Sequence, residues 1–134
     1  MYRVWWFPEY SPSEQKVFDE VMKIVQDSYK QLGYTHIETP AVERTDVLTA
    51  KSWQETWKQI FWLYGLAQWD KKEYSLHFDL TVPFARYVLD WENELAFPFK
   101  RSQIQKVWRW ERTQKWRFKE LYQADIDVIW PAFS

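Results

Sequence analysis

Residues 97–129 read FPFKRSQIQKVWRWERTQKWRFKELYQADIDVI, and this stretch decides the fold class of the chain. Polar and apolar side chains alternate along residues 101–109 and again along residues 118–129. Because successive side chains of a strand point to opposite faces, the alternation predicts two long strands, each with one polar and one apolar face. The charged segment between them, residues 110–117, is expected to be the loop of an antiparallel hairpin.

A helix is predicted upstream of this hairpin, over residues 12–32. Ser11, Pro12 and Glu14 have the spacing of a capping box, with serine at the N-cap and proline in the first turn. Apolar residues then recur every three or four positions, as they do on one face of a helix. Gly33 supplies the C-terminal stop, since glycine readily adopts the left-handed conformation that ends a helix.

Shorter elements are expected between the helix and the hairpin. The predicted strands are residues 34–39, 58–64 and 73–80, with a polar turn region at 68–72, and a short helix covers residues 82–90. Gly-rich phosphate loops and tight β-α-β alternation are missing, which argues against a Rossmann or Walker-type site. We therefore expect one domain over residues 1–134 with an α+β fold, an antiparallel sheet flanked by helices.

Composition excludes several classes of protein. A length of 134 residues corresponds to one domain, and 46% apolar with 28% charged residues is typical of a globular chain. The lack of cysteine excludes disulfides and thiolate metal sites, and no paired histidine spacing predicts a metal site. No apolar run reaches the roughly 20 residues of a membrane span, and no signal pattern is present, so a cytoplasmic location is expected. A net charge of -1 argues against a free-standing nucleic-acid binder.

Tryptophan and glycine are present in unusual amounts. The chain has 11 Trp and 2 Gly, where ordinary usage predicts about 9 glycines in this length. Trp110 and Trp116 stand in short charged segments where a tight turn would use glycine. One interpretation is an aromatic-rich natural core. The preferred one is an altered or designed sequence, because ring burial gives no reason for tryptophan in turns.

Polar side chains are expected on one face of the predicted sheet. They are Gln103, Gln105 and Arg109 in the first hairpin strand, Gln123, Asp125 and Asp127 in the second, and His77, Asp79 and Thr81 in the preceding strand. This face either meets water, as in many half-exposed sheets, or forms a binding site. Arginine binds phosphate or carboxylate, and a carboxylate binds ammonium. The arginines at the hairpin tip and the nearby acids would therefore suit a zwitterionic amino acid beside a nucleotide phosphate.

Three stretches, in this order, resemble class II aminoacyl-tRNA synthetases. GYTHIETPAVE, residues 33–43, resembles their motif 1. FDLTVPFARYV, residues 78–88, resembles the amino-acid-binding segment of histidyl-tRNA synthetases, and residues 97–129 resemble their motif 2. The resemblance covers residues 7–130, and long motifs in a fixed order are far more specific than a single short pattern.

The resemblance implies a histidine site and an ATP site. Four side chains would hold the histidine ammonium: Asp79, Thr81, Gln123 and Asp127. Arg109, the catalytic residue, would grip the α-phosphate and the substrate carboxylate, while Glu111 would help seat adenine and Arg117 would meet the terminal phosphates. The implied reaction is attack of the histidine carboxylate on the α-phosphorus of ATP, with Mg²⁺ and arginines offsetting the developing charge. Motif 1 further implies a homodimer or higher self-association.

Several departures from the family pattern predict weak or absent activity. His77 stands where the family has arginine, Trp116 where it has glycine, Leu121 where an aromatic ring stacks on adenine, and Ala124 where it has cysteine. The chain is expected to be a truncated core without motif 3 or the anticodon-binding domain, so contact with the tRNA acceptor end would be weak or absent. The alternatives are a designed structural protein and a non-catalytic histidine-binding module. His36 is interpreted as a structural or interface residue.

Overall fold

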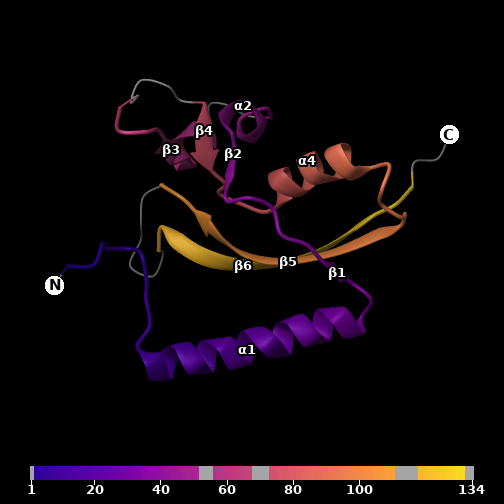
Figure 1. Cartoon of the computed structure of the whole chain (residues 1–134), viewed down its shortest axis with the longest axis horizontal. Helices are drawn as coiled ribbons and strands as arrows, with labels where there is room; N and C mark the ends of the chain where they lie inside the picture. The colour runs from indigo at the N-terminus through magenta and orange to yellow at the C-terminus, as the bar shows by residue number, and fades with distance from the viewer. Residues whose placement is uncertain (1, 52–55, 68–72, 111–117, 132–134) are drawn as a thin grey trace.

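The computed structural model describes residues 2–51, 56–67, 73–110 and 118–131. The elements in chain order are α1 (Pro12–Gln31), β1 (Thr35–His36), β2 (Val42–Arg44), α2 (Thr45–Leu48), the 3₁₀ turn η1 (Trp57–Gln59), β3 (Trp62–Leu63), β4 (Tyr74–Leu76), α4 (Thr81–Trp91), β5 (Phe99–Trp108) and β6 (Glu120–Ile129). The strands form two three-stranded sheets, in the orders β1-β5-β6 and β2-β4-β3 (Figure 1). Within the described ranges, no helix is long and apolar enough to cross a membrane.

The predicted first helix is confirmed at both ends. The Ser11 hydroxyl accepts a hydrogen bond from the Glu14 backbone N–H at 3.4 Å, and the Ser11 N–H donates to the Glu14 carboxylate at 3.1 Å. At the other end Gly33 has φ 86°, and the Tyr34 N–H donates to the Tyr29 carbonyl at 3.1 Å. Helix α1 is therefore defined by its own local sequence.

The predicted hairpin is also confirmed. Strands β5 and β6 pair in antiparallel register along their whole length, with Arg101 opposite Asp127 and Ile104 opposite Ala124. Strand β1 pairs with the other edge of β5 in parallel, Thr35 opposite Arg101, so this sheet is mixed. The α+β class therefore stands, with one parallel pair added to the antiparallel hairpin.

The other predicted strands are longer than the observed ones. Of the strand predicted at residues 34–39, only β1 forms, because the Thr39 N–H donates to the Gln105 side chain instead of to the backbone of a neighbouring strand. Residues 58–64 split into η1 and β3, and the strand predicted at 73–80 ends at Leu76. Strand β2 and helix α2 were not predicted, and the turn predicted at 68–72 lies outside the described residues.

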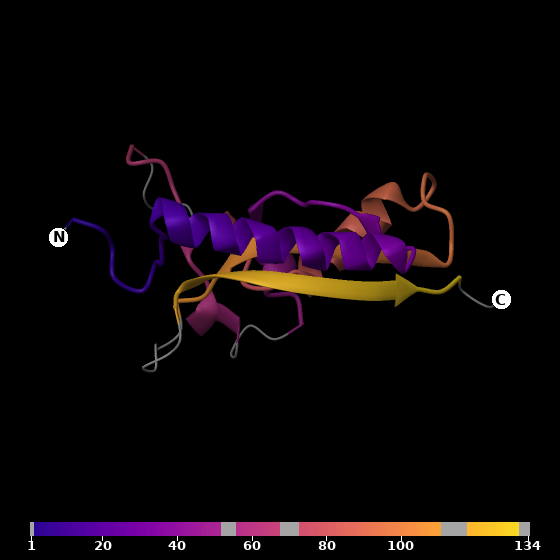
Figure 2. The same ribbon diagram turned by 90° about the horizontal axis from the view of Figure 1, so that it is seen from below.

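The two long helices lie on opposite faces of the β1-β5-β6 sheet (Figures 1 and 2). Helix α4, predicted at residues 82–90, contributes Phe84 to a core with Ile37 and Phe99. Helix α1 contains no buried residue and meets the opposite face through Phe18, whose ring lies 4.9 Å from that of Tyr122. The face toward α4 is therefore the one that combines the small apolar core with the predicted polar residues.

Candidate functional site

The hairpin places the predicted polar side chains in two facing rows. Gln103 lies opposite Asp125, and Gln105 lies opposite Gln123. Directly opposed residues of an antiparallel pair project from the same face of the sheet. The sequence-based assignment of these side chains to one face is therefore correct, and the same register adds the pair Arg101 and Asp127 to it.

Two arginines of the hairpin hold the segment that carries Asp79. The Arg109 Nε donates to the Phe78 carbonyl at 3.0 Å, and the Arg101 Nη2 donates to the Leu80 carbonyl at 3.3 Å. The carbonyls on both sides of Asp79 are therefore held by guanidinium groups. We call this arrangement the arginine clamp, and it brings the start of α4 against the polar face of the hairpin.

The negative charge of Asp79 is not fully stabilised by the residues around it. Burial raises the pKa of Asp79, and the charge of Asp125 acts in the same direction. The Val82 N–H, at 3.4 Å from Asp79 Oδ1, and the charge of Arg109 lower this pKa but do not outweigh burial. A cation bound beside Asp79 would favour its ionised form, which is the electrostatic requirement for holding an ammonium group.

A hydrogen-bond network fixes the floor of this face. The Gln103 Nε2 donates to the Thr39 hydroxyl at 3.0 Å and to the Gln105 Oε1 at 2.6 Å. Gln105 in turn accepts from the Thr39 N–H at 2.9 Å and donates to the Thr39 carbonyl at 2.7 Å. These bonds tie the chain after β1 to β5, so the two glutamines have defined positions.

Some buried polar atoms on this face have no hydrogen-bond partner among the described residues. They are the acceptor oxygens Gln103 Oε1 and Gln123 Oε1 and the donor Arg101 Nε. An unpartnered buried polar group costs free energy, so such groups commonly mark the place of a ligand or an ordered water. Arg101 also lies with its guanidinium carbon 4.1 Å from the Phe84 ring centroid, and burial lowers its pKa.

The other predicted site residues are exposed or lie outside the described residues. Thr81 is the first residue of α4 and its side chain is exposed. Asp127 is exposed too, and its Oδ1 accepts from the Val128 N–H at 2.8 Å. The predicted ATP contacts Glu111 and Arg117 lie outside the described residues.

His77 does not share the polar face with Asp79, and that prediction is wrong. Strand β4 ends before His77, so strand alternation does not apply to residues 77–81. The His77 ring is fully buried, its Nε2 lies 2.6 Å from the Lys106 carbonyl, and it stacks on Trp108 at 5.7 Å. Burial lowers the pKa of His77, which keeps the ring neutral. His36, in contrast, lies in β1 with its Nε2 3.6 Å from Glu38, and both side chains are largely exposed.

Comparison with known proteins identifies the family. The chain matches the family model for Histidyl-tRNA synthetase over residues 7–129. This chain belongs to the histidyl-tRNA synthetase family. The histidine–tRNA ligase of Finegoldia magna is 47% identical over 121 residues, and that of Xylella fastidiosa is 45% identical over 130 residues. Histidyl-tRNA synthetase from Nostoc has a crystal structure that aligns with TM-score 0.82 at 38% identity, over 96% of this chain.

The matched region is a fraction of a full histidyl-tRNA synthetase. The chain covers 27% of the Finegoldia ligase, 28% of the Xylella ligase and 28% of the Nostoc structure. Two more distant structures share the fold: a Bacillus halodurans protein described as an ATP phosphoribosyltransferase regulatory subunit/histidyl-tRNA synthetase, with TM-score 0.76 at 22% identity, and a pyrrolysyl-tRNA synthetase from Desulfitobacterium hafniense, with TM-score 0.68 at 18% identity.

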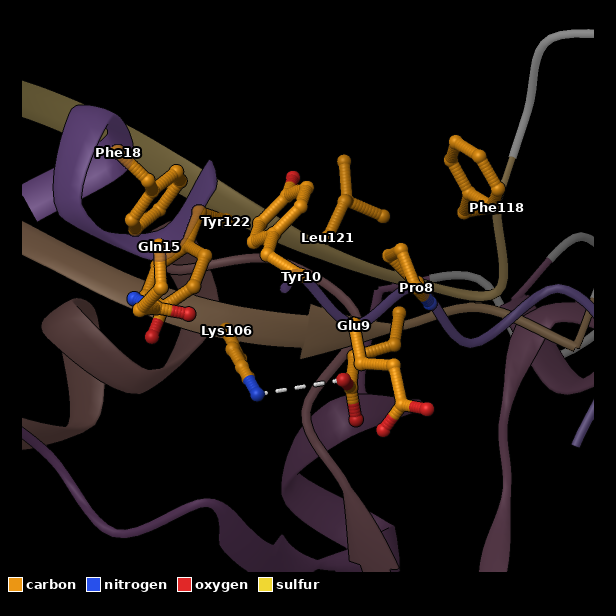
Figure 3. Close-up of a pocket in the computed structure, with 10 residues that line it drawn as sticks. Pro8, Glu9, Tyr10, Gln15, Phe18, Lys106, Phe118, Leu121 and Tyr122 are labelled. Carbon is orange, nitrogen blue, oxygen red and sulfur yellow. Dashed lines mark ion pairs between the residues drawn. The ribbon is translucent and has the colours of Figure 1, made fainter. Parts of the chain in front are cut away.

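A cavity of about 380 Å³ lies on the opposite face of the sheet from the arginine clamp, between the start of α1 and the hairpin (Figure 3). The rings of Tyr10, Phe18 and Tyr122 line it, and Lys106 Nζ forms an ion pair with Glu120 at 3.3 Å. Leu121 also lines this cavity. In this synthetase-family chain the aromatic cluster of Tyr10, Phe18 and Tyr122 is thus separate from the predicted histidine residues.

Sequence reasoning missed two residues of the polar face. Arg101 could have been found, because it lies an even number of positions from Gln103 and Gln105 in a predicted strand. Thr39 carried no such signal, since its place in the network depends on how the chain after β1 crosses the sheet. Trp110, at a glycine-like turn position, packs its ring 5.1 Å from Phe61 and lies under the Lys119 ammonium at 4.0 Å.

Proposed function

We propose that this chain binds histidine on the polar face of the hairpin and, with ATP, forms histidyl-adenylate at a low rate. Membership of the histidyl-tRNA synthetase family supports the choice of substrate and reaction class. The observation that carries the proposal is the arginine clamp around Asp79, with unpartnered acceptor oxygens on the same face. A partly buried carboxylate beside unpartnered acceptors suits an ammonium donor.

The proposed roles of the side chains follow from their charge. Asp79, Thr81, Gln123 and Asp127 receive the histidine ammonium. Arg109 keeps its two terminal nitrogens for the α-phosphate and the substrate carboxylate, because the bond to Phe78 uses its Nε. The carboxylate attacks while already ionised, so the step needs no general base.

The bond changes of the proposed step balance without another reactant. One oxygen of the histidine carboxylate forms a bond to the α-phosphorus of ATP, and the bond from that phosphorus to the pyrophosphate oxygen breaks. Glu111 and Arg117 would contact adenine and the terminal phosphates. The described residues include no group of three or more side chains that could hold a metal. Mg²⁺ would enter bound to the ATP phosphates. When bound, Mg²⁺ neutralises charge on the phosphates.

A low rate is expected because the adenine site lacks an aromatic platform. Leu121 offers no ring for stacking, and it lines the cavity on the α1 side of the hairpin. Aromatic stacking on a base is worth about 1–3 kcal/mol. Loss of that term lowers the population of correctly seated ATP by roughly tenfold or more.

Histidine-dependent exchange of labelled pyrophosphate into ATP tests the reaction, and calorimetry with histidine tests binding. Wild type should bind histidine and show slow exchange, Asp79→Asn should weaken both, and Arg109→Ala should lose exchange while keeping part of the binding. Asp46→Asn is the matched control, since Asp46 is an exposed carboxylate paired with Arg44 away from the site. Binding without exchange would leave a non-catalytic histidine-binding module. No binding at all would refute the proposal and favour a purely structural protein.

Self-association forms a second part of the proposal. Apolar residues stay exposed on β6, Tyr122 at 45% and Ile126 at 43%, and on α1, Val21 at 51% and Ile24 at 66%. Strand β6 is also an edge strand of its sheet within the described residues. Exposed apolar side chains beside an open strand edge favour pairing with a second copy.

A further inference from the structure

Trp6 has a backbone conformation that belongs to glycine. Its φ is 70°, and within the described ranges no other non-glycine residue has a positive φ. A bulky side chain with positive φ is a genuine outlier, because its Cβ approaches the following carbonyl oxygen. Glycine adopts this conformation without that cost.

The conformation of Trp6 is fixed by a contact with the hairpin. The Lys119 N–H, at the start of the returning strand, donates to the Trp6 carbonyl at 2.7 Å. The ring has no matching role in the core, since it lies half-exposed with its centroid 6.4 Å from the exposed ring of Trp5. The backbone at position 6 is therefore used by the fold, while the tryptophan ring is not.

Other tryptophans show the same lack of a buried ring. None of the tryptophans within the described ranges is buried, although tryptophan is highly buried on average in folded proteins. Trp110 is 56% exposed just after β5, and Trp130 is 68% exposed just after β6. Both stand where a strand has ended, a usual place for glycine.

Trp108 is only half-buried but provides the contrast. Its ring stacks on His77 at 5.7 Å, and its Nε1 donates to the Glu120 carboxylate at 2.7 Å. This ring and its N–H both have partners, as expected of a true tryptophan position. Trp110 differs from it in exposure, since its ring packs 5.1 Å from that of Phe61 but 56% of the residue stays exposed.

The composition of the chain supports the presence of tryptophan at positions that belong to glycine. The chain has 11 Trp and 2 Gly, against about 9 glycines expected for this length. A set of glycine positions occupied by tryptophan accounts for the excess of one and the shortage of the other together. Neither a designed core nor an aromatic-rich natural core explains tryptophans that leave much of their surface exposed.

We infer that Trp6, Trp110 and Trp130 are glycine positions of this protein, encoded by UGA codons that its native translation system reads as glycine. UGA differs by one base from the tryptophan codon UGG and by one base from the glycine codon GGA. A translation system in which UGA is a sense codon can therefore assign it to either residue. Trp108 would be encoded by UGG.

The gene tests this inference directly. UGA at positions 6, 110 and 130 together with UGG at position 108 is the expected result. UGG at any of the first three positions, or UGA at position 108, would overturn it. An altered or designed gene made for expression in a standard host would carry UGG at all four positions.

Protein variants test the structural part independently of the gene. Trp6→Gly should melt about 3 °C or more above Trp6→Ala, because both remove the ring but only glycine relieves the positive φ. Trp108→Gly should lower the melting temperature, since it removes a ring that packs on His77. A Trp6→Ala variant at least as stable as Trp6→Gly would show that position 6 does not require glycine.

Discussion

The ion pair between Glu43 and Arg86 connects β2 to α4, the helix that follows the arginine-clamped segment. Loss of this ion pair should destabilise the fold measurably. Arg86 Nε lies 3.0 and 3.1 Å from the two Glu43 oxygens, and Arg86 Nη2 lies 2.9 Å from Oε1. The Glu43 side chain is 5% exposed and that of Arg86 26%. The proposed change is Glu43→Ala.

The expected loss follows from the burial of the pair. Breaking a buried pair by removing one partner costs about 3–5 kcal/mol, because the other charge stays buried. Arg86 keeps its bond to Asp90 at 3.0 Å and part of its exposure, which lowers the expectation to about 2–3 kcal/mol. For a domain of this size that loss corresponds to a fall in melting temperature of about 10 °C.

Urea unfolding followed by circular dichroism measures the change in free energy. Asp90→Ala is the control, because Asp90 is 59% exposed and its pair with the same arginine should contribute under about 1 kcal/mol. A double-mutant cycle with Arg86→Met should return a coupling energy of about 2 kcal/mol for Glu43 and Arg86. Equal losses in Glu43→Ala and Asp90→Ala would refute the reasoning, since burial would then make no difference.

Three more predictions concern the site, the first helix and the sheet edge. Asp79→Asn should raise stability at pH 7 and weaken histidine binding about tenfold or more. Because burial raises the pKa of Asp79, the wild type should gain stability from this group as the pH falls through that pKa toward the ordinary aspartate range, and the variant should not. Urea unfolding at a series of pH values measures both free energies. Ser11→Ala should cost about 1 kcal/mol by removing the bond to the Glu14 N–H, and an unchanged urea midpoint would contradict it. Ile126→Lys should shift sedimentation velocity profiles toward monomer, and Lys30→Glu on α1 serves as a control that leaves β6 unchanged.

Local signals explain which parts of the fold could be predicted. The capping box and Gly33 define α1 through residues within a few positions of each other, so sequence alone is sufficient. The β5–β6 hairpin was predictable because polar and apolar residues alternate along much of both strands. The resemblance of three stretches to class II synthetases then predicted that the fold is a synthetase core.

Elements that depend on distant contacts could not be predicted. Strand β2 pairs with β4, which lies more than thirty positions later in the chain, and its residues show no clear alternation. The position of His77 depends on two distant segments, because its N–H donates to the Ala41 carbonyl in the register of the β2–β4 pair and its ring packs against Trp108 of β5. Because of this packing, His77 does not lie on the polar face, although its position in the sequence predicted that it would.

The arginine clamp has a consequence for the thermodynamics of ligand binding. Because Arg101 and Arg109 hold the carbonyls on both sides of Asp79 in the free chain, the acidic group is positioned before any ligand arrives. A preorganised site loses little conformational entropy on binding, so more of the interaction energy appears as affinity. The Val82 amide hydrogen, which donates to the Asp79 carboxylate at 3.4 Å, should accordingly exchange slowly with solvent even without histidine, and added histidine should protect it little further.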